Sequence, residues 1–180
     1  MSDLDQWADI LDPNEKILWQ GRPDGGFALK VSNIFSTIFG LVFAGFALFW
    51  MTMASQAGGK FWMFGILHFS VGFGLVLHAL FWSTFKRRNS WYTLTDRRAF
   101  IAVNIPLRGK SLKSYPITAS SSLELIDGAL TSVNFAEEIK RGKNKSYTVP
   151  IGFERLTDGR EVYRLMRKIQ TKAQAKGTSA

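Results

Sequence analysis

WYTLTDRRAF, residues 91–100, is predicted to form a β-hairpin. Residues 91–95 are rich in aromatic and β-branched side chains, which favour strands, and Asp96-Arg97 supplies a charged turn before a further apolar segment. The hairpin begins six residues after an uncharged run that ends at Phe85. Two kinds of structure therefore meet at this point of the chain, and the residues on either side indicate what they are.

Two uncharged runs precede the hairpin, one between Lys30 and Lys60 and one between Lys60 and Lys86. Each run exceeds the roughly 20 apolar residues that cross the hydrocarbon core of a bilayer. We expect transmembrane helices over 31–53 and 61–84. Tryptophans flank the expected helix ends, as in the aromatic belts of membrane proteins: Trp50, Trp62, Trp82 and Trp91. The alternative, two buried helices of a soluble bundle, needs a far larger protein around them.

The distribution of cations predicts the orientation of these helices. The loop between them carries only Lys60, whereas Arg22 and Lys30 precede the first helix and three consecutive cations, residues 86–88, follow the second. This asymmetry predicts a multi-pass protein of the cytoplasmic (inner) membrane, with both termini in the cytoplasm. The segment of 30 residues before the first run has six Asp and Glu against three Lys and Arg, a net charge of −3, so we do not expect that run to be a secretory signal.

Beyond the second helix the pattern changes to short strands, which we expect over 90–95, 98–104, 112–117, 122–126, 132–136 and 147–154. A final helix is expected over 159–173, with Asp158 and Glu161 as a capping box. An apolar stripe on this helix is predicted to pack on the strands: Val162, Leu165, Met166 and Ile169. Before the first membrane helix, we expect a short amphipathic helix over 3–11 and a strand over 16–20.

The predicted fold class is an α+β membrane protein, in which a two-helix transmembrane hairpin carries a small antiparallel β-barrel or sandwich capped by a C-terminal helix. The expected organisation is an N-terminal cytoplasmic helix and strand (1–30), the hairpin (31–85), a cytoplasmic domain (86–173) and a disordered tail (174–180).

Two motifs on either side of the membrane hairpin give a family resemblance. The first is E-x-I-L-W-x-G-R-P, formed by Glu15, Ile17, Leu18, Trp19, Gly21, Arg22 and Pro23. The second is Y-x-L-T-D-x-R, formed by Tyr92, Leu94, Thr95, Asp96 and Arg98. With residues 151–158 as a last strand leading into a helix, the chain resembles the membrane-anchored bacterial pleckstrin-homology-like (PH-like) proteins over about residues 12–170.

The resemblance implies a fold and no particular activity. It implies a bent antiparallel sheet of seven strands that a C-terminal helix closes at one end. Six strands are expected after the membrane hairpin, so the strand over 16–20 is the candidate for the seventh. The hairpin would then be an insertion near the start of the domain, and residues 91–100 would continue a domain already begun.

Few residues suit catalysis or cofactor binding. The chain has no Cys, and its two His, His68 and His78, both lie in the second predicted membrane helix. Ten residues apart on a helix, they are separated by about 15 Å along its axis, so they cannot share one metal ion. They are expected to serve as hydrogen-bonding contacts between helices, with a role in an oligomeric metal or haem site left open. We predict a non-enzymatic protein without a cofactor or resident metal.

Small residues repeat along both predicted membrane helices. Ser36, Gly40 and Ala44 recur every four residues in the first, and Ser70 and Gly74 do so in the second. Small residues let helix backbones approach closely. These positions are predicted to pack the two helices together, or to form a contact between copies of the chain.

The charge distribution is the main functional indication. The formal net charge is +9, and the segment from Lys86 onward holds 19 Lys and Arg against eight Asp and Glu. Candidate contacts to anionic lipid or a partner are Lys86, Arg87, Arg88, Arg164 and Arg167. A basic stripe on the C-terminal helix could instead dock the acidic N-terminal residues Asp3, Asp5 and Asp9.

The remaining basic segments are Arg97-Arg98 and the loop over 141–145. A strand over 90–95 places the hairpin turn about 20 Å from its start, beyond the reach of a headgroup, so we expect Arg97 and Arg98 to form salt bridges there. The predicted function is a membrane-anchored binding or scaffolding domain whose ligand is anionic membrane lipid, a membrane-protein partner or a second copy, and not nucleic acid. The alternative is an accessory subunit of a larger membrane transport or envelope complex.

Overall fold

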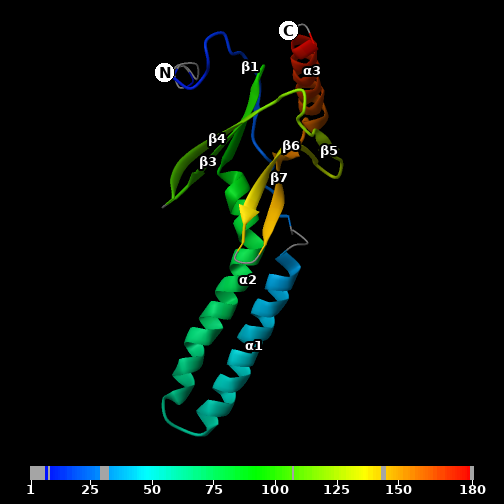
Figure 1. The fold of residues 1–180 in the computed structure, drawn as a ribbon. Helices are drawn as coiled ribbons and strands as arrows, with labels where there is room; N and C mark the ends of the chain where they lie inside the picture. The colour runs from blue at the N-terminus through cyan, green and yellow to red at the C-terminus, as the bar shows by residue number, and fades with distance from the viewer. Residues whose placement is uncertain (1–6, 8, 29–32, 107, 143–144, 179–180) are drawn as a thin grey trace. The chain divides into compact units, whose positions relative to one another are not determined.

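The computed structural model describes residues 7, 9–28, 33–106, 108–142 and 145–178. The chain divides into two compact units (Figure 1). The helical unit is Gly25–Arg87, and the β unit combines Met1–Asp24 with Arg88–Ala180. The helical unit is therefore inserted in the sequence of the β unit.

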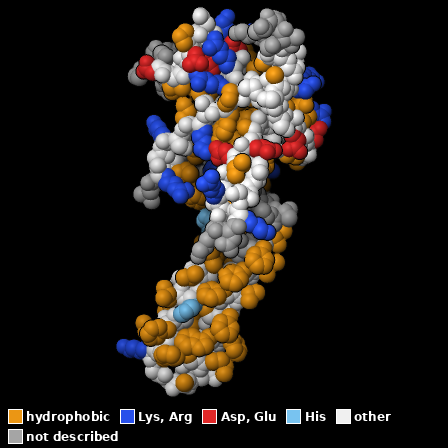
Figure 2. All heavy atoms as spheres, in the orientation of Figure 1, with side chains coloured by type: hydrophobic (Ala, Val, Ile, Leu, Met, Phe, Trp, Pro, Cys, Tyr) orange, Lys and Arg blue, Asp and Glu red, His pale blue; other side chains and the backbone are white. Residues whose placement is uncertain are grey.

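The helical unit consists of α1 (Ile34–Gln56), a short 3-10 helix η2 (Phe61–Met63) and α2 (Phe64–Arg88). Two helices of the described chain, Ile34–Gln56 and Phe61–Arg88, are long and apolar enough to cross a membrane. On the face seen in Figure 2, their side chains are predominantly apolar, whereas the β unit presents many charged side chains. The second helix extends beyond the predicted boundary at residue 84, because its last turn is made by cations that hydropathy alone excludes from a membrane helix.

The two helices pack through small residues, only some of which were predicted. Gly40 and Ala44 of α1 are buried. A Cβ atom on Gly72 would lie 2.8 Å from the backbone nitrogen of Ala44, so this position requires glycine. Ser36, Ser70 and Gly74 are exposed, so their predicted contact between the two helices is wrong, and the alternative contact between copies of the chain stays a prediction. Residues two positions from Gly72 point about 200° away from it around the helix, which turns them from α1.

The β unit contains two antiparallel sheets among its described residues. The first has the order β1-β2-β3-β4, formed by Ile17–Gly21, Ser90–Thr95, Arg98–Ile105 and Gly109–Pro116. The second has the order β5-β6-β7, formed by Glu124–Ile126, Thr131–Arg141 and Ser146–Leu156. β1 pairs with β2, with Trp19 opposite Leu94. The predicted participation of a strand from before the apolar helices is confirmed.

The six strands expected after the helices are all present, but β6 and β7 are each 11 residues long. The prediction stopped β6 at residue 136, because residues 137–141 hold four charged side chains and a single apolar one, Ile139, and so show no hydrophobic alternation. Cross-strand hydrogen bonds hold this extension, with Arg141 paired to Ser146 at its end. The result is a long hairpin whose outer part has no buried face.

The core lies between the inner faces of the two sheets and α3 (Gly159–Thr178). The ring of Tyr92 stacks on Phe153 at 4.6 Å between centroids, and Phe135 meets Phe153 edge-on at 5.0 Å. Val162 and Met166 of α3 are fully buried against these rings. Leu165, predicted to be equally buried, is only half-buried, because it lies at the margin of the stripe centred on Val162, Met166 and Ile169.

Both ends of α3 differ from the prediction. The Asp158 carboxylate, expected to cap the helix, instead accepts a hydrogen bond from the Trp19 indole N–H at 2.5 Å. At the other end the helix continues to Thr178, so residues 174–178 are helical and not a disordered tail.

Buried Gln170 of α3 also escaped prediction, and its side-chain amide donates to the backbone oxygen of Ser121 at 2.7 Å.

The helix expected over 3–11 falls mostly outside the described residues, which exclude 1–6 and 8. Its described part forms a turn, in which the backbone N–H groups of Ile10 and Leu11 both donate to the carbonyl oxygen of Trp7 at 3.0 Å. The Trp7 ring meets the Phe100 ring edge-on at 5.4 Å. This turn therefore packs on the face of the four-stranded sheet that points away from the core.

Candidate functional site

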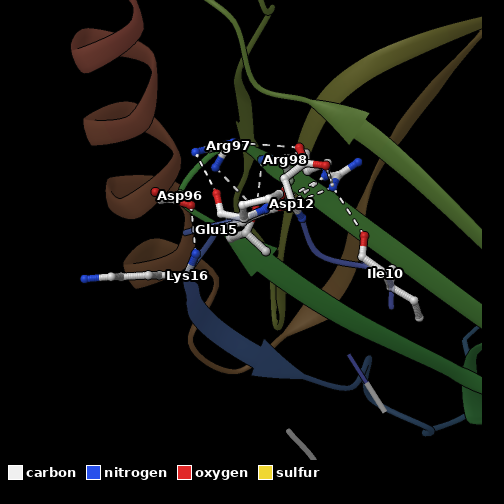
Figure 3. Close-up of polar contacts among 9 residues, drawn as sticks. Ile10, Asp12, Glu15, Lys16, Asp96, Arg97 and Arg98 are labelled. Atoms are coloured by element: carbon white, nitrogen blue, oxygen red, sulfur yellow. Dashed lines mark hydrogen bonds and ion pairs between the residues drawn. The ribbon is translucent and has the colours of Figure 1, made fainter. Parts of the chain in front are cut away.

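A buried ion pair joins the sequence motif before the apolar helices to the motif after them, at the β2–β3 turn (Figure 3). The Glu15 side chain has no exposed surface, and Arg98 donates to it twice, from Nη2 to Oε2 at 2.8 Å and from Nε to Oε1 at 3.0 Å. The Thr95 hydroxyl donates to Oε1 at 2.6 Å, and the Asp12 backbone N–H donates to Oε2 at 2.9 Å. The Nε atom of Arg98 is also 3.3 Å from Oε2, so the carboxylate receives five hydrogen bonds, from Arg98, Thr95 and the backbone of Asp12.

These bonds keep Glu15 ionised although its side chain has no exposed surface. Burial by itself would raise the pKa of Glu15, but hydrogen bonds from Arg98, Thr95 and the Asp12 backbone, with the charge of Arg98, outweigh it and lower the pKa to about 2. The same pair raises the pKa of Arg98. Both groups therefore remain charged at all physiological pH values.

The other motif residues also have structural roles. Asp96 accepts a hydrogen bond from the Lys16 backbone N–H at 3.0 Å, and its own N–H donates to the Lys16 carbonyl oxygen at 3.0 Å. Tyr92 and Leu94 belong to the core. Arg98 is also 3.2 Å from Asp12, and Arg97 is 3.8 Å from the same carboxylate. The predicted salt bridges at this turn are confirmed.

The five predicted lipid or partner contacts divide into two groups. Arg87 is only 4% exposed, and its guanidinium donates to the Gly26 carbonyl oxygen at 3.0 Å and the Thr84 hydroxyl at 3.1 Å. Its assignment as a surface contact was wrong, because a cation at the end of an apolar helix satisfies its donors inside the helical unit. The other four cations are exposed: Lys86, Arg88, Arg164 and Arg167.

The suggested docking of the N-terminal segment on α3 finds no support in the described residues. Arg160, part of that basic stripe, pairs with Asp127 at 3.1 Å. Arg167 donates to the Gln170 side-chain oxygen at 3.2 Å. Asp3 and Asp5 lie outside the described residues.

The four-stranded sheet has two ends, and the cations at these ends have different partners. We call the end with the β2–β3 turn the turn end. The opposite end, where β1 stops at Gly21, β2 starts at Ser90 and β3 turns into β4, is the entry end, because the chain leaves and re-enters the β unit there. In Figure 1 the end of β6 and the start of β7 lie toward the entry end of the β unit.

The outer part of the β6–β7 hairpin combines apolar and basic side chains, and we call it the basic tip: Ile139, Lys140, Arg141, Lys145 and Tyr147. Ile139 is 74% exposed and Tyr147 is 55% exposed, although both are large. No ion pair involves the three cations in the described part of the chain. The sequence showed this loop to be basic, but only the structure shows where the exposed Ile139 and Tyr147 lie.

The acid nearest the basic tip on β6 is held by the other sheet. Glu138 accepts hydrogen bonds from Lys113 at 2.7 Å and from the Tyr115 hydroxyl at 2.5 Å. These two bonds lower the pKa of Glu138, whereas burial and the bond to Glu138 raise the pKa of Tyr115. Glu138 is therefore a structural acid that ties β6 to β4.

The two histidines do not join α1 to α2 through hydrogen bonds in the described part of these helices. The Nδ1 atom of His68 lies 3.1 Å from the carbonyl oxygen of Phe64, one turn earlier on the same helix. His78 stacks on Trp82 at 5.3 Å. Among the described residues, no three His, Asp or Glu side chains are grouped to hold a metal ion.

No protein-family model, curated protein or solved structure matches this chain.

Proposed function

We propose that this protein is a membrane-anchored, PH-like domain without enzymatic activity, which binds anionic lipid headgroups at the inner face of the cytoplasmic membrane. The two apolar helices would form the anchor. Seven antiparallel strands in sheets of four and three, with a C-terminal helix packed on the core, support the PH-like assignment. The exposed, apolar and basic tip of the β6–β7 hairpin is the observation that carries the lipid-binding proposal.

Chain connectivity favours contact between the entry end and the membrane. Only Asn89 separates the last residue of α2 from the first residue of β2. If α2 crosses the bilayer, Ser90 can lie only a few Å from the point where the helix emerges. Headgroups would then be close to the entry end of the β unit, and the turn end would lie about 20 Å further along β2.

The composition of the basic tip fits an anionic interface. Lys140, Arg141 and Lys145 each provide about 1 kcal/mol of attraction when close to an anionic surface. Ile139 can insert among the acyl chains, and Tyr147 suits the headgroup level because its ring is apolar and its hydroxyl is polar. An ordinary soluble surface needs neither Ile139 nor Tyr147 at such exposure.

A fluorescent label on the tip tests this function. Because the chain has no Cys, Ser146→Cys gives a single site for an environment-sensitive dye, and Ser120→Cys gives a matched site in the turn after β4. The full chain is placed in nanodiscs of pure phosphatidylcholine or of phosphatidylcholine with phosphatidylglycerol. We expect a blue shift at residue 146 in the anionic discs only, which disappears when Arg141 and Lys145 are changed to Gln.

Equal emission from residue 146 in both discs would contradict the proposal, as would a shift that persists in the double variant. Fixed-ratio co-purification with other membrane proteins, together with no shift, would favour the accessory-subunit alternative.

The same absence of Cys allows the orientation to be tested. In intact cells, Gly58→Cys in the loop between the helices should react with a membrane-impermeant maleimide, and Ser146→Cys should react only after the cells are opened. The reverse pattern would contradict a cytoplasmic β unit.

A further inference from the structure

A groove runs across the outer face of the four-stranded sheet, opposite the core. It has a volume of about 780 Å³, within the range of sites that hold small molecules. Trp91, Ala102 and Leu112 form one row across its floor, because Trp91 is opposite Ala102 on β2 and β3, and Ala102 is opposite Leu112 on β3 and β4. Leu112 remains 41% exposed.

The N-terminal segment forms one wall of the groove. Trp7 and Ile10 both line it. The Trp7 ring packs on Phe100, and the Ile10 carbonyl oxygen accepts a hydrogen bond from Arg98 at 3.4 Å. Since Arg98 also binds Glu15, the ion pair at the turn end helps to hold this wall in place.

The charge of the groove has one sign. Arg22 and Lys110 line it, and none of its described lining residues is Asp or Glu. The guanidinium carbon of Arg22 lies 4.6 Å from the centroid of the Trp91 ring, so this cation makes a cation–π contact with one residue of the floor. Lys110 lies near the start of β4, at the entry end, where it is directly opposite Asn104 of β3 in the strand register. Neither cation has a carboxylate partner in the described part of the chain.

We propose that the groove binds one anionic amphiphile, a molecule with an apolar chain and a carboxylate or phosphate head. The apolar chain lies over Trp91, Ala102 and Leu112, and the head lies between Arg22 and Lys110. An apolar floor without cations would bind neutral and anionic amphiphiles equally well. Cations without the apolar floor would bind any anion. The combination selects for both properties. This site is separate from the basic tip and does not rest on the function proposed above.

Photocross-linking tests the site in the full chain. The protein is held in phosphatidylcholine nanodiscs and exposed to palmitate that carries a diazirine on its chain, or to the corresponding fatty alcohol. A diazirine-bearing lysophosphatidic acid tests the phosphate head. Both acids should cross-link to residues of β2, β3 and β4 in the groove, and the alcohol should do so about tenfold less, since it lacks the charge contacts. Cross-links to α1 and α2 report partition into the disc and should be similar for all probes.

Variants separate the groove from nonspecific adhesion. R22Q with K110Q should lower groove cross-linking by about tenfold, and A102W should abolish it by filling the floor. R164Q with R167Q removes the same charge from an exposed face of α3 and should leave it unchanged. If A102W perturbs the sheet, as judged by amide exchange, L112Q provides a second change of the floor. Equal labelling by acid and alcohol, or labelling that survives both R22Q/K110Q and the floor variants, would overturn the proposal.

Discussion

The two ends of the β unit use their cations differently. At the turn end, Arg98 is matched by the buried carboxylate of Glu15, and Arg97 lies near Asp12. At the entry end, Arg22 covers Trp91, and Lys110 and Arg141 have no carboxylate partner in the described chain. Basic residues in this protein therefore cannot be interpreted by charge alone: those with buried acids stabilise the fold, and those without are free to meet an anionic ligand.

The largest effect is expected from removing the acid at the turn end. Glu15→Gln removes the buried carboxylate that Arg98 binds and leaves it only the exposed carboxylate of Asp12, and breaking a buried pair by removing one partner costs about 3–5 kcal/mol. Glu137→Gln, at an exposed acid on β6, is the matched control and should change the free energy of unfolding by less than about 0.5 kcal/mol. Urea denaturation of the full chain in detergent, followed by the circular dichroism of the strands, measures both.

Equal effects of Glu15→Gln and Glu137→Gln on the free energy of unfolding would mean that the ion pair at the turn end does not stabilise the fold. Amide exchange in β2 and β3 gives an independent measurement, since opening of the turn end should release protection there first.

Acid should weaken the turn end in the same way. The folded-state pKa of Glu15 is lowered from 4.5 to about 2, so its contribution is complete above pH 4.5 and is lost as the pH falls toward 2. At 1.36 kcal/mol per pKa unit, the loss is about 3 kcal/mol. Other carboxylates also titrate in this range, so the measured quantity is the difference between the native chain and Glu15→Gln. That difference should shrink between pH 4.5 and pH 2, and a constant difference would contradict a buried, ionised Glu15.

Much of the fold could be predicted from the sequence because its signals are local. Strand composition and turn residues located β2 and β3 almost to the residue, and the apolar stripe of α3 identified Val162 and Met166 as core. The motif order around the apolar helices predicted that the strand over 16–20 would belong to the same sheet domain, and the structure pairs it with β2. Each of these inferences depends on residues within one or two elements.

The parts that escaped prediction depend on partners far apart in the chain. Glu15 and Arg98 are separated by 83 residues, and no periodicity reveals that this acid is buried. The burial of Arg87 depends on Thr84 and on the carbonyl oxygen of Gly26, which charge counting does not include. The groove arises only when side chains of four strands and the N-terminal segment share one face. The sequence did place Glu15 and Arg98 in the two motifs. The motifs indicated a family resemblance, but not that these two side chains form a buried ion pair.

At the entry end, charge removal should affect lipid contact without affecting stability. Changing Lys140, Arg141 and Lys145 together to Gln should weaken association of the tip with anionic discs by about 1 kcal/mol per charge. The free energy of unfolding should change by no more than about 0.5 kcal/mol per site, because these side chains are exposed. Quenching of a label at residue 146 by lipid-borne quenchers, with urea denaturation alongside, measures both quantities. A loss of stability comparable to that of Glu15→Gln would remove the distinction between the two ends.

The smallest effect is expected on α3, which lies outside this comparison. Arg164 and Arg167 are exposed, and the guanidinium of Arg167 donates to the side-chain oxygen of Gln170 on the same helix. Changing both to Gln should leave the free energy of unfolding within about 0.5 kcal/mol per site, as is usual for surface positions. It should also leave the tip label unchanged, since we assign the lipid contact to the entry end. A reduced blue shift at residue 146 in the α3 double variant would mean that the whole basic surface attracts lipid through its net charge. The unpaired cations of the entry end would then have no special part in binding.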